Sequence, residues 1–95
     1  MKFHKIIRTL RKNKGFGIKQ VAPELGFDYT YLSKLENNKA NPSAKVIKKM
    51  ADYYKYDQDE LFLSAGKIPE DVQKILVSNP EKAIELLRKE FGERE

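Results

Sequence analysis

The 95-residue sequence contains no cysteine and only one histidine, His4. Without cysteine, no disulfide and no thiolate site can form, and a single histidine is more typical of a protein surface than of a metal centre. We therefore expect no metal and no cofactor. No apolar run approaches the length of a membrane span, and the chain does not begin with a signal-peptide core. These absences predict a cytoplasmic protein without a membrane segment.

Motifs of known enzymes are also missing, although three short stretches resemble catalytic or ligand-binding motifs. Ser64–Lys67 matches the S-x-x-K acyl-transfer motif, but its partner motifs are absent and the chain is too short for such an enzyme. Asp57–Glu60 holds carboxylates but lacks the glycine and the distant glutamate of a calcium loop. Gly15–Gly17 does not match a phosphate-binding loop. We expect no enzymatic activity.

Charge is abundant instead, and it is unevenly distributed. The chain has 19 lysine and arginine residues against 14 acidic residues, a net charge of +5. Residues 1–66 hold 13 basic and 7 acidic side chains, whereas residues 67–95 hold 6 and 7. A basic body with a nearly neutral tail suits a polyanion-binding part joined to an interaction part. A solvated, lysine-rich surface would have the same composition.

Apolar residues recur at helical spacing along the whole chain, which predicts an all-α protein. In the first 66 residues the expected helices run over 3–13, from the N-cap Gly17 to Leu25, from the N-cap Asp28 to about Asn37, from Ser43 to Tyr54, and over 58–64. Ser43 and Asp57 are the expected N-caps of the last two. On the first helix the basic residues are expected to point outward: Lys2, Lys5, Arg8 and Lys12.

The stretch from Gly26 to Ser43 organises this pattern. Gly26 suits a left-handed turn, and the carboxylate of Asp28 can accept a hydrogen bond from the first free N–H groups of the next helix. Leu32 and Leu35 point to one side of that helix, and the rest of its surface is polar. So short and polar a helix is not stable alone in water, so the rest of the fold must support it. Its outward face is then free to bind a partner.

Two helices joined by a short turn at Gly26 form a helix-turn-helix arrangement. Over residues 3–63 or so, the sequence resembles the Cro/repressor-type (XRE) helix-turn-helix family. The matching positions are Ala22, Leu25, Gly26, Phe27, Leu32, Ser33, Leu35, Glu36, Lys39, Pro42 and Ser43. The resemblance implies a compact five-helix repressor-like bundle as a DNA-binding domain at residues 1–66. It also implies a sequence-specific transcriptional regulator, a repressor or controller, that binds operator DNA as a homodimer.

The same resemblance implies roles for individual residues, because the second helix of the motif enters the DNA major groove in this family. The base-reading positions match Tyr29, Thr30 and Lys34, with Ser33 and Asp28 as lesser candidates. The phosphate-binding loop, which acts largely through N–H groups and lysine, matches Asn37, Asn38 and Lys39, and Lys19 and Lys14 are further candidates. Glu36 matches an inward glutamate that pairs with an arginine of the first helix, here Arg11.

Three positions depart from the family pattern. Pro23 lies inside the second helix, where proline costs about 3 kcal/mol, so we expect a bend or an early end there, compensated by packing of Val21 and Leu25. Ile18 stands where glutamine commonly donates to a phosphate, so that contact is either missing or supplied by a neighbour such as Lys19. Asn38 replaces the usual glycine of the loop. Asparagine tolerates the left-handed conformation, so we expect the turn to persist.

Residues 67–95 lie outside the family's core region and predict two amphipathic helices, the second opening with Asn79 as N-cap and Pro80 at its first position. Their apolar stripes contain Ile68, Val72, Ile75 and Leu76, then Ile84, Leu87 and Phe91. This extension either dimerises or covers the bundle. If its main partner is a different protein, the chain is instead a helical interaction module or an antitoxin. Salt-dependent DNA binding separates the two functions.

Overall fold

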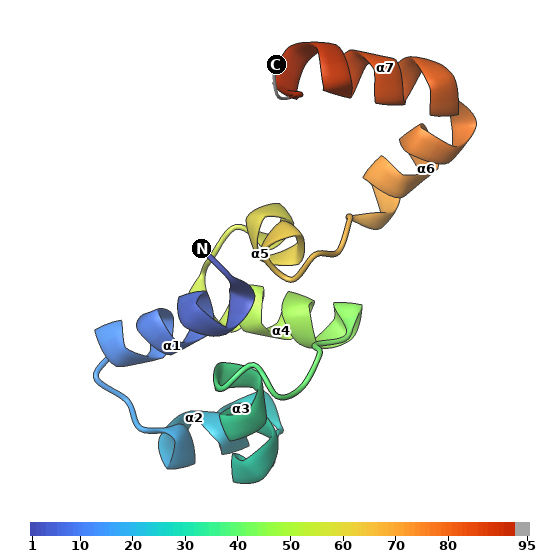
Figure 1. Ribbon diagram of the computed structural model, residues 1–95. Helices are drawn as coiled ribbons and strands as arrows, with labels where there is room; N and C mark the ends of the chain where they lie inside the picture. Colours follow the sequence, from blue (N-terminus) through green and yellow to red (C-terminus); the bar gives the residue numbers. More distant parts are fainter. Residues whose placement is uncertain (93–95) are drawn as a thin grey trace.

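The computed structural model describes residues 1–92, and over that range every regular element is a helix, as the periodicity predicts. The helices are α1 (Phe3–Asn13), α2 (Ile18–Leu25), α3 (Tyr29–Glu36), α4 (Ala44–Tyr54), α5 (Gln58–Ser64), α6 (Glu70–Ser78) and α7 (Pro80–Phe91). Figure 1 shows α1 to α5 gathered into a bundle, from which α6 and α7 extend. The all-α expectation is confirmed.

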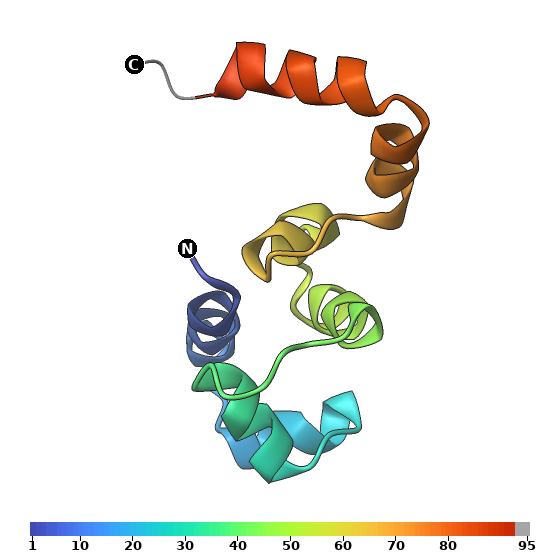
Figure 2. The ribbon, with the colours of Figure 1, turned by 45° about the vertical axis from the view of Figure 1, so that its right-hand side comes forward.

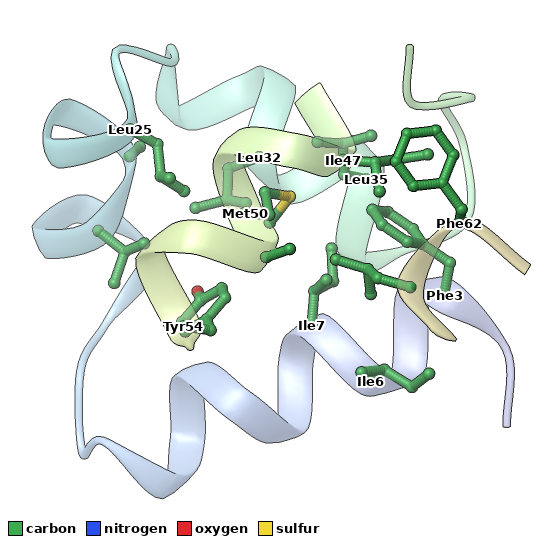
Figure 3. Packing of buried hydrophobic residues seen from close by; sticks show 14 residues of the cluster. Phe3, Ile6, Ile7, Leu25, Leu32, Leu35, Ile47, Met50, Tyr54 and Phe62 are labelled. Carbon is green, nitrogen blue, oxygen red and sulfur yellow. The ribbon is translucent and has the colours of Figure 1, made fainter. Parts of the chain in front are cut away.

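One apolar core holds the five-helix bundle together. Ile7 of α1, Leu32 of α3, Ile47 of α4 and Leu61 of α5 are completely inaccessible to solvent. Figure 3 shows that Ile7, Leu32 and Met50 point into the space enclosed by these helices. Burying a side chain of this size stabilises the fold by about 1.5–3 kcal/mol. The core therefore supplies the support that the short helix α3 lacks on its own.

Helix α2 continues through Pro23 and ends at Leu25, so of the two expected outcomes, a bend or an early end, the early end does not occur. Val21 and Leu25, on either side of the proline, are 0% and 3% exposed, and their burial offsets the lost backbone hydrogen bond. Pro23 itself is exposed. Gly26 then ends the helix at φ +74°, a left-handed conformation that glycine adopts without a steric penalty.

Gly17 is the N-cap of α2 as expected, and of the three expected N-caps with a polar side chain in the bundle two form a capping hydrogen bond. The Ser43 hydroxyl accepts from the N–H of Val46 at 3.2 Å, and the Asp57 carboxylate accepts from the N–H of Glu60 at 2.9 Å. Asp28 occupies the N-cap position of α3, but its side chain accepts no hydrogen bond from that helix. The predicted capping bond of Asp28 is therefore wrong, and its carboxylate is exposed just before α3.

Helices α6 and α7 contact each other but bury none of their own residues. Figures 1 and 2 show from two directions that both helices extend away from the bundle. Their apolar side chains remain accessible, Ile75 at 57%, Leu87 at 47% and Phe91 at 82%. The extension does not cover the bundle in this structure.

Among the helices of residues 1–92, none combines the length and the apolar character that crossing a membrane requires.

Candidate nucleic-acid interface

Helix α3 has one buried side and one open side. Leu32, Leu35 and Glu36 are at most 1% exposed and hold the helix against the core. The predicted base-reading residues line the open side: Tyr29, Thr30 and Lys34 are exposed, Ser33 is half-buried, and Asp28 is exposed just before the helix. The helix therefore presents hydroxyl, ammonium and carboxylate groups to solvent from a fixed backbone.

An ion pair between α1 and α3 fixes the C-terminal end of α3. Arg11 Nε donates to Glu36 Oε2 and Arg11 Nη2 donates to Glu36 Oε1, both at 2.8 Å. Arg11 Nη1 donates to the carbonyl of Phe16, also at 2.8 Å. The hydrogen bond to Glu36 raises the pKa of Arg11 above its ordinary value. The structure thus contains the pair that the family resemblance implies.

Arg8 also contacts the end of α3, although helical periodicity places it on the outward side of α1. Its Nη2 donates to the carbonyl of Glu36 at 2.8 Å and to Asn37 Oδ1 at 2.7 Å, and its Nε lies 3.7 Å from Glu36 Oε1. The outward assignment of Arg8 is therefore wrong. The available signal was its spacing: Arg8 precedes Arg11 by three residues, so both side chains leave α1 in similar directions.

Asn37, a predicted phosphate contact, is already engaged inside the protein. Its Nδ2 donates to the Ser33 carbonyl at 2.8 Å and lies 3.3 Å from Ser33 Oγ, while its Oδ1 accepts from Arg8. The side chain therefore links α1 to the open side of α3. Its contact with phosphate stays a prediction.

The loop after α3 closes the helix with its own N–H groups. Lys39 N–H donates to the Lys34 carbonyl at 2.8 Å, and the N–H groups of Asn37 and Asn38 donate to Ser33 and Leu35. Asn38 adopts φ +58°, so the turn persists without glycine, as predicted. These three N–H groups therefore have partners inside the protein, and contact of the loop with phosphate stays a prediction. The ammonium of Lys39 is exposed beside them.

Lys14 and Lys19, the two further phosphate candidates, are both exposed near the first turn of α2. The ammonium of Lys14 lies 5.9 Å from the centre of the Phe16 ring and 5.7 Å from that of Tyr53, within cation–π range. Ile18 is half-buried and packs against the core, so it offers no phosphate donor. Lys19 is the adjacent cation.

Helix α4 supports the turn between α2 and α3 through two side chains that sequence reasoning missed. Lys49 Nζ donates to the carbonyl of Leu25 at 2.8 Å and lies 5.5 Å from the centre of the Phe27 ring. The Tyr53 hydroxyl donates to the carboxylate of Glu24. Apolar periodicity could not identify these contacts, because they are made by the polar ends of partly exposed side chains.

The turn itself is packed by aromatic rings. Tyr31 meets Phe27 edge-on, with ring centres 5.2 Å apart. The Tyr31 ring therefore packs within the motif, against the turn that joins α2 to α3. No cluster of three potential metal ligands occurs in residues 1–92. What the surface of α3 offers is a set of hydrogen-bond donors and acceptors on a rigid helix.

Comparison with known proteins gives two matches. The model of a family described as "Helix-turn-helix domain" matches residues 5–67, a range that contains α2 to α5 and most of α1. The sequence is also 42% identical over 59 residues to the HTH-type transcriptional regulator SlrR of Bacillus subtilis (strain 168). That match covers 61% of this chain but 39% of SlrR, so the chain spans well under half the length of this relative.

Proposed function

The chain belongs to the helix-turn-helix family, of the Cro/repressor (XRE) type, and from this membership we propose that it is a transcriptional regulator that binds specific sequences of double-stranded DNA. The observation that carries the proposal is that α3 has one buried side and one open side. Its buried side is fixed by Leu32, Leu35 and the Arg11–Glu36 pair, while its open side is polar. A rigid helix with such a surface suits the major groove, where base edges differ in their donors and acceptors.

In the proposed complex, the open side of α3 enters the major groove. Lys34 can donate to guanine O6 and N7, and Thr30 can bond a base or contact a thymine methyl group. Tyr29 can contact a base through its hydroxyl or its ring. Ser33 and Asp28 flank these three residues and are lesser contacts. The specificity of the protein would then depend on side chains that contribute little to its folding, since they are largely exposed.

Cations around the helix would hold the DNA backbone. Lys39 follows α3 directly, and Lys19 and Lys14 lie near the start of α2. Each phosphate neutralised by such a lysine releases condensed counterions, so binding should weaken steeply with salt. The net positive charge of residues 1–66 favours the same partner. Asn37 and Asn38 would approach the backbone as neutral groups.

We further propose that α6 and α7 join two copies of the chain, so that the pair acts as a repressor or controller on two operator half-sites. Their apolar side chains are uncovered in the single chain. Helix α7 also has Glu81 in its first turn and Arg88 and Lys89 in its last. Two antiparallel α7 helices would place the acidic start of each beside the basic end of the other. A two-fold dimer matches half-sites about one helical turn apart.

Selection of bound sequences from random duplex DNA by the full chain tests this function. We expect one enriched sequence, repeated with two-fold symmetry, whose affinity falls linearly on logarithmic axes as salt is raised. A Tyr29→Ala/Thr30→Ala/Lys34→Ala variant serves as the control, because its exposed substitutions leave the core intact; it should enrich no sequence. No enrichment by the full chain itself would contradict the proposal and favour an interaction module that binds a protein through α6 and α7.

A further inference from the structure

Three side chains form a hydrogen-bonded relay from α1 to the open side of α3. Arg8 Nη2 donates to Asn37 Oδ1 at 2.7 Å, and Asn37 Nδ2 donates to the Ser33 carbonyl at 2.8 Å and to Ser33 Oγ at 3.3 Å. Arg8 cannot swing away freely, because the same Nη2 donates to the Glu36 carbonyl at 2.8 Å. The relay therefore ends on a hydroxyl beside the exposed Lys34, on the helix proposed to meet DNA.

The chemistry of the three groups gives the relay one direction. A guanidinium carries only N–H donors, so the atom of Asn37 that faces Arg8 must be the amide oxygen. The NH₂ group of Asn37 then faces Ser33 and can only donate. A serine hydroxyl has one hydrogen and two lone pairs, so Ser33 Oγ, while it accepts from Asn37, keeps its hydrogen for another partner.

We propose that Arg8 and Asn37 are positioning residues that set the Ser33 hydroxyl as a hydrogen-bond donor toward DNA. Ser33 then recognises an acceptor on a base edge in the major groove: a purine N7, guanine O6 or thymine O4. The amino groups of adenine and cytosine, which also donate, offer this hydrogen no acceptor. This inference rests on the proposed function, since it requires α3 to meet DNA, and it adds one specific base contact by Ser33 to those of Tyr29, Thr30 and Lys34.

Without the relay, the same serine would recognise DNA poorly. A hydroxyl in a helix can turn inward and donate to a backbone carbonyl one turn earlier, here that of Tyr29. It would then present lone pairs outward, and the distinction between acceptor and donor on the base would be lost. The NH₂ group of Asn37 donates to the Ser33 carbonyl and to Ser33 Oγ together, so it occupies one lone pair of the hydroxyl and fixes the side from which the oxygen accepts.

The first experiment removes acceptors from the selected duplex one position at a time. Guanine or adenine is replaced by its 7-deaza form, which has C–H in place of N7, and guanine is replaced by 2-aminopurine, which lacks O6. Thymine is replaced by 5-methylcytosine paired with guanine, which has an amino group in place of O4 and keeps the methyl group. The native chain should lose about 3- to 10-fold in affinity at one position, the range of a single net hydrogen bond. Ser33→Ala should bind the unmodified duplex more weakly than the native chain, and the base substitution at that position should not reduce its affinity further. Equal sensitivity of both proteins at every position would overturn the proposal.

Backbone oxygens are acceptors too, and a second set of duplexes distinguishes them. Each carries one uncharged methylphosphonate linkage in the region that α3 covers. If Ser33→Ala abolishes the effect of one such linkage and of no base substitution, the hydroxyl faces a phosphate and the base-edge assignment is wrong. We expect the methylphosphonate effects to be the same in the native chain and in Ser33→Ala.

The positioning role is tested with Asn37→Ala, which removes an exposed side chain and spares the core. In Asn37→Ala, removing the base acceptor that Ser33 contacts should cost less affinity than in the native chain, as it does in Ser33→Ala. The double variant should be no less sensitive to this base change than Ser33→Ala alone. Arg8→Ala should act in the same direction, whereas Lys12→Ala, which removes an exposed α1 cation outside the relay, should weaken all duplexes alike. If Asn37→Ala loses as much affinity as the native chain when that acceptor is removed, the positioning role of the relay is wrong. Absence of any selected DNA would instead contradict the proposed function itself.

Discussion

Arg11 and Glu36 join α1 to the last turn of α3 through two parallel hydrogen bonds of 2.8 Å, with Glu36 only 1% exposed. Such a bidentate arrangement fixes both the distance and the orientation of the two helices. The third donor of the guanidinium binds the Phe16 carbonyl, so the pair also anchors the segment that leads into α2. One buried pair thereby positions both helices of the motif.

Removing either partner should destabilise the fold severely. Arg11→Ala leaves the carboxylate of Glu36 buried without a counterion, and Glu36→Ala does the same to Arg11, at a cost of about 3–5 kcal/mol each. Urea unfolding of the single and double variants forms a double-mutant cycle. We expect the double variant to be far less destabilised than the sum of the two single variants.

A matched comparison is the exposed pair of Lys55 and Asp52, 3.8 Å apart with both side chains more than four-fifths exposed. Asp52→Ala should barely change the free energy of unfolding, because solvent screens an exposed pair. Additive losses at Arg11 and Glu36, with no coupling between them, would show that the pair does not act as a buried unit.

Tyr54 should make the fold sensitive to alkaline pH. Its side chain is 6% exposed, and no described residue is hydrogen-bonded to its hydroxyl. Burial, followed by the nearby charge of Glu36, raises the pKa of Tyr54 well above the ordinary 10.0. Above that ordinary value the unfolded chain releases the proton while the folded chain keeps it, so deprotonation favours unfolding. Stability is thus complete below about pH 10 and declines as pH rises further.

Tyr54→Phe should flatten that decline and raise stability at neutral pH by up to about 1 kcal/mol, because it removes an unpaired buried hydroxyl. Urea titrations from pH 8 to pH 11 measure both effects. Tyr53→Phe is the comparison: donation to Glu24 raises the pKa of Tyr53 to about 12, but its ring is partly exposed and its hydroxyl is paired. It should lower stability slightly at neutral pH. An unchanged alkaline decline in Tyr54→Phe would refute the assignment.

The sequence predicts the helices well because local physical chemistry determines most of their boundaries. Residues 3–13 and 58–64 form the expected helices, and Ser43 and Asp57 cap as expected, since apolar spacing and short acceptor side chains act over a few residues. Pro23 shows where local reasoning is insufficient. The penalty and the compensating burial of Val21 and Leu25 are both expected, but which of them decides where α2 ends depends on the packing of the whole bundle.

The site is only partly predictable for the same reason. The exposed residues of α3 follow from periodicity and the family resemblance together. The relay from Arg8 through Asn37 to Ser33 does not, because it joins residues more than twenty positions apart through polar atoms. No helical pattern encodes which rotamer a long, half-exposed arginine adopts. The missing capping bond of Asp28 to α3 likewise depends on geometry that the residue type alone does not determine.

The extension should be separable from the bundle. A chain shortened to residues 1–69 keeps the N–H of Lys67, which donates to the Phe62 carbonyl at the end of α5, keeps the buried Pro69, and loses two helices that bury no residue. Its thermal midpoint should therefore match that of the full chain measured at high dilution. Sedimentation should show a monomer for the short chain and a dimer for the full chain. A monomeric full chain at high concentration would refute dimerisation through α6 and α7.

Within the interface, the strongest test separates residues that contact bases from residues that contact phosphates. Thr30 and Lys34 lie on the open side of α3, whereas Lys39 lies just beyond its end. Base contacts carry sequence information, and phosphate contacts supply affinity without it. Thr30→Ala and Lys34→Ala should therefore relax preference at particular base pairs by about 1–3 kcal/mol, the range of a good direct contact.

Lys39→Ala should behave differently from both. It should weaken binding to the selected site, to its single-base variants and to random duplex by similar factors, and lower the salt slope by about one unit. Lys34→Ala removes the same charge five positions earlier, so the two variants are matched in electrostatics and differ in what they contact. Because Lys39 N–H already bonds the Lys34 carbonyl at 2.8 Å, the substitution leaves the turn intact and tests the ammonium alone. Losses from Thr30→Ala and Lys34→Ala that are uniform over all duplexes would show that α3 does not read the major groove.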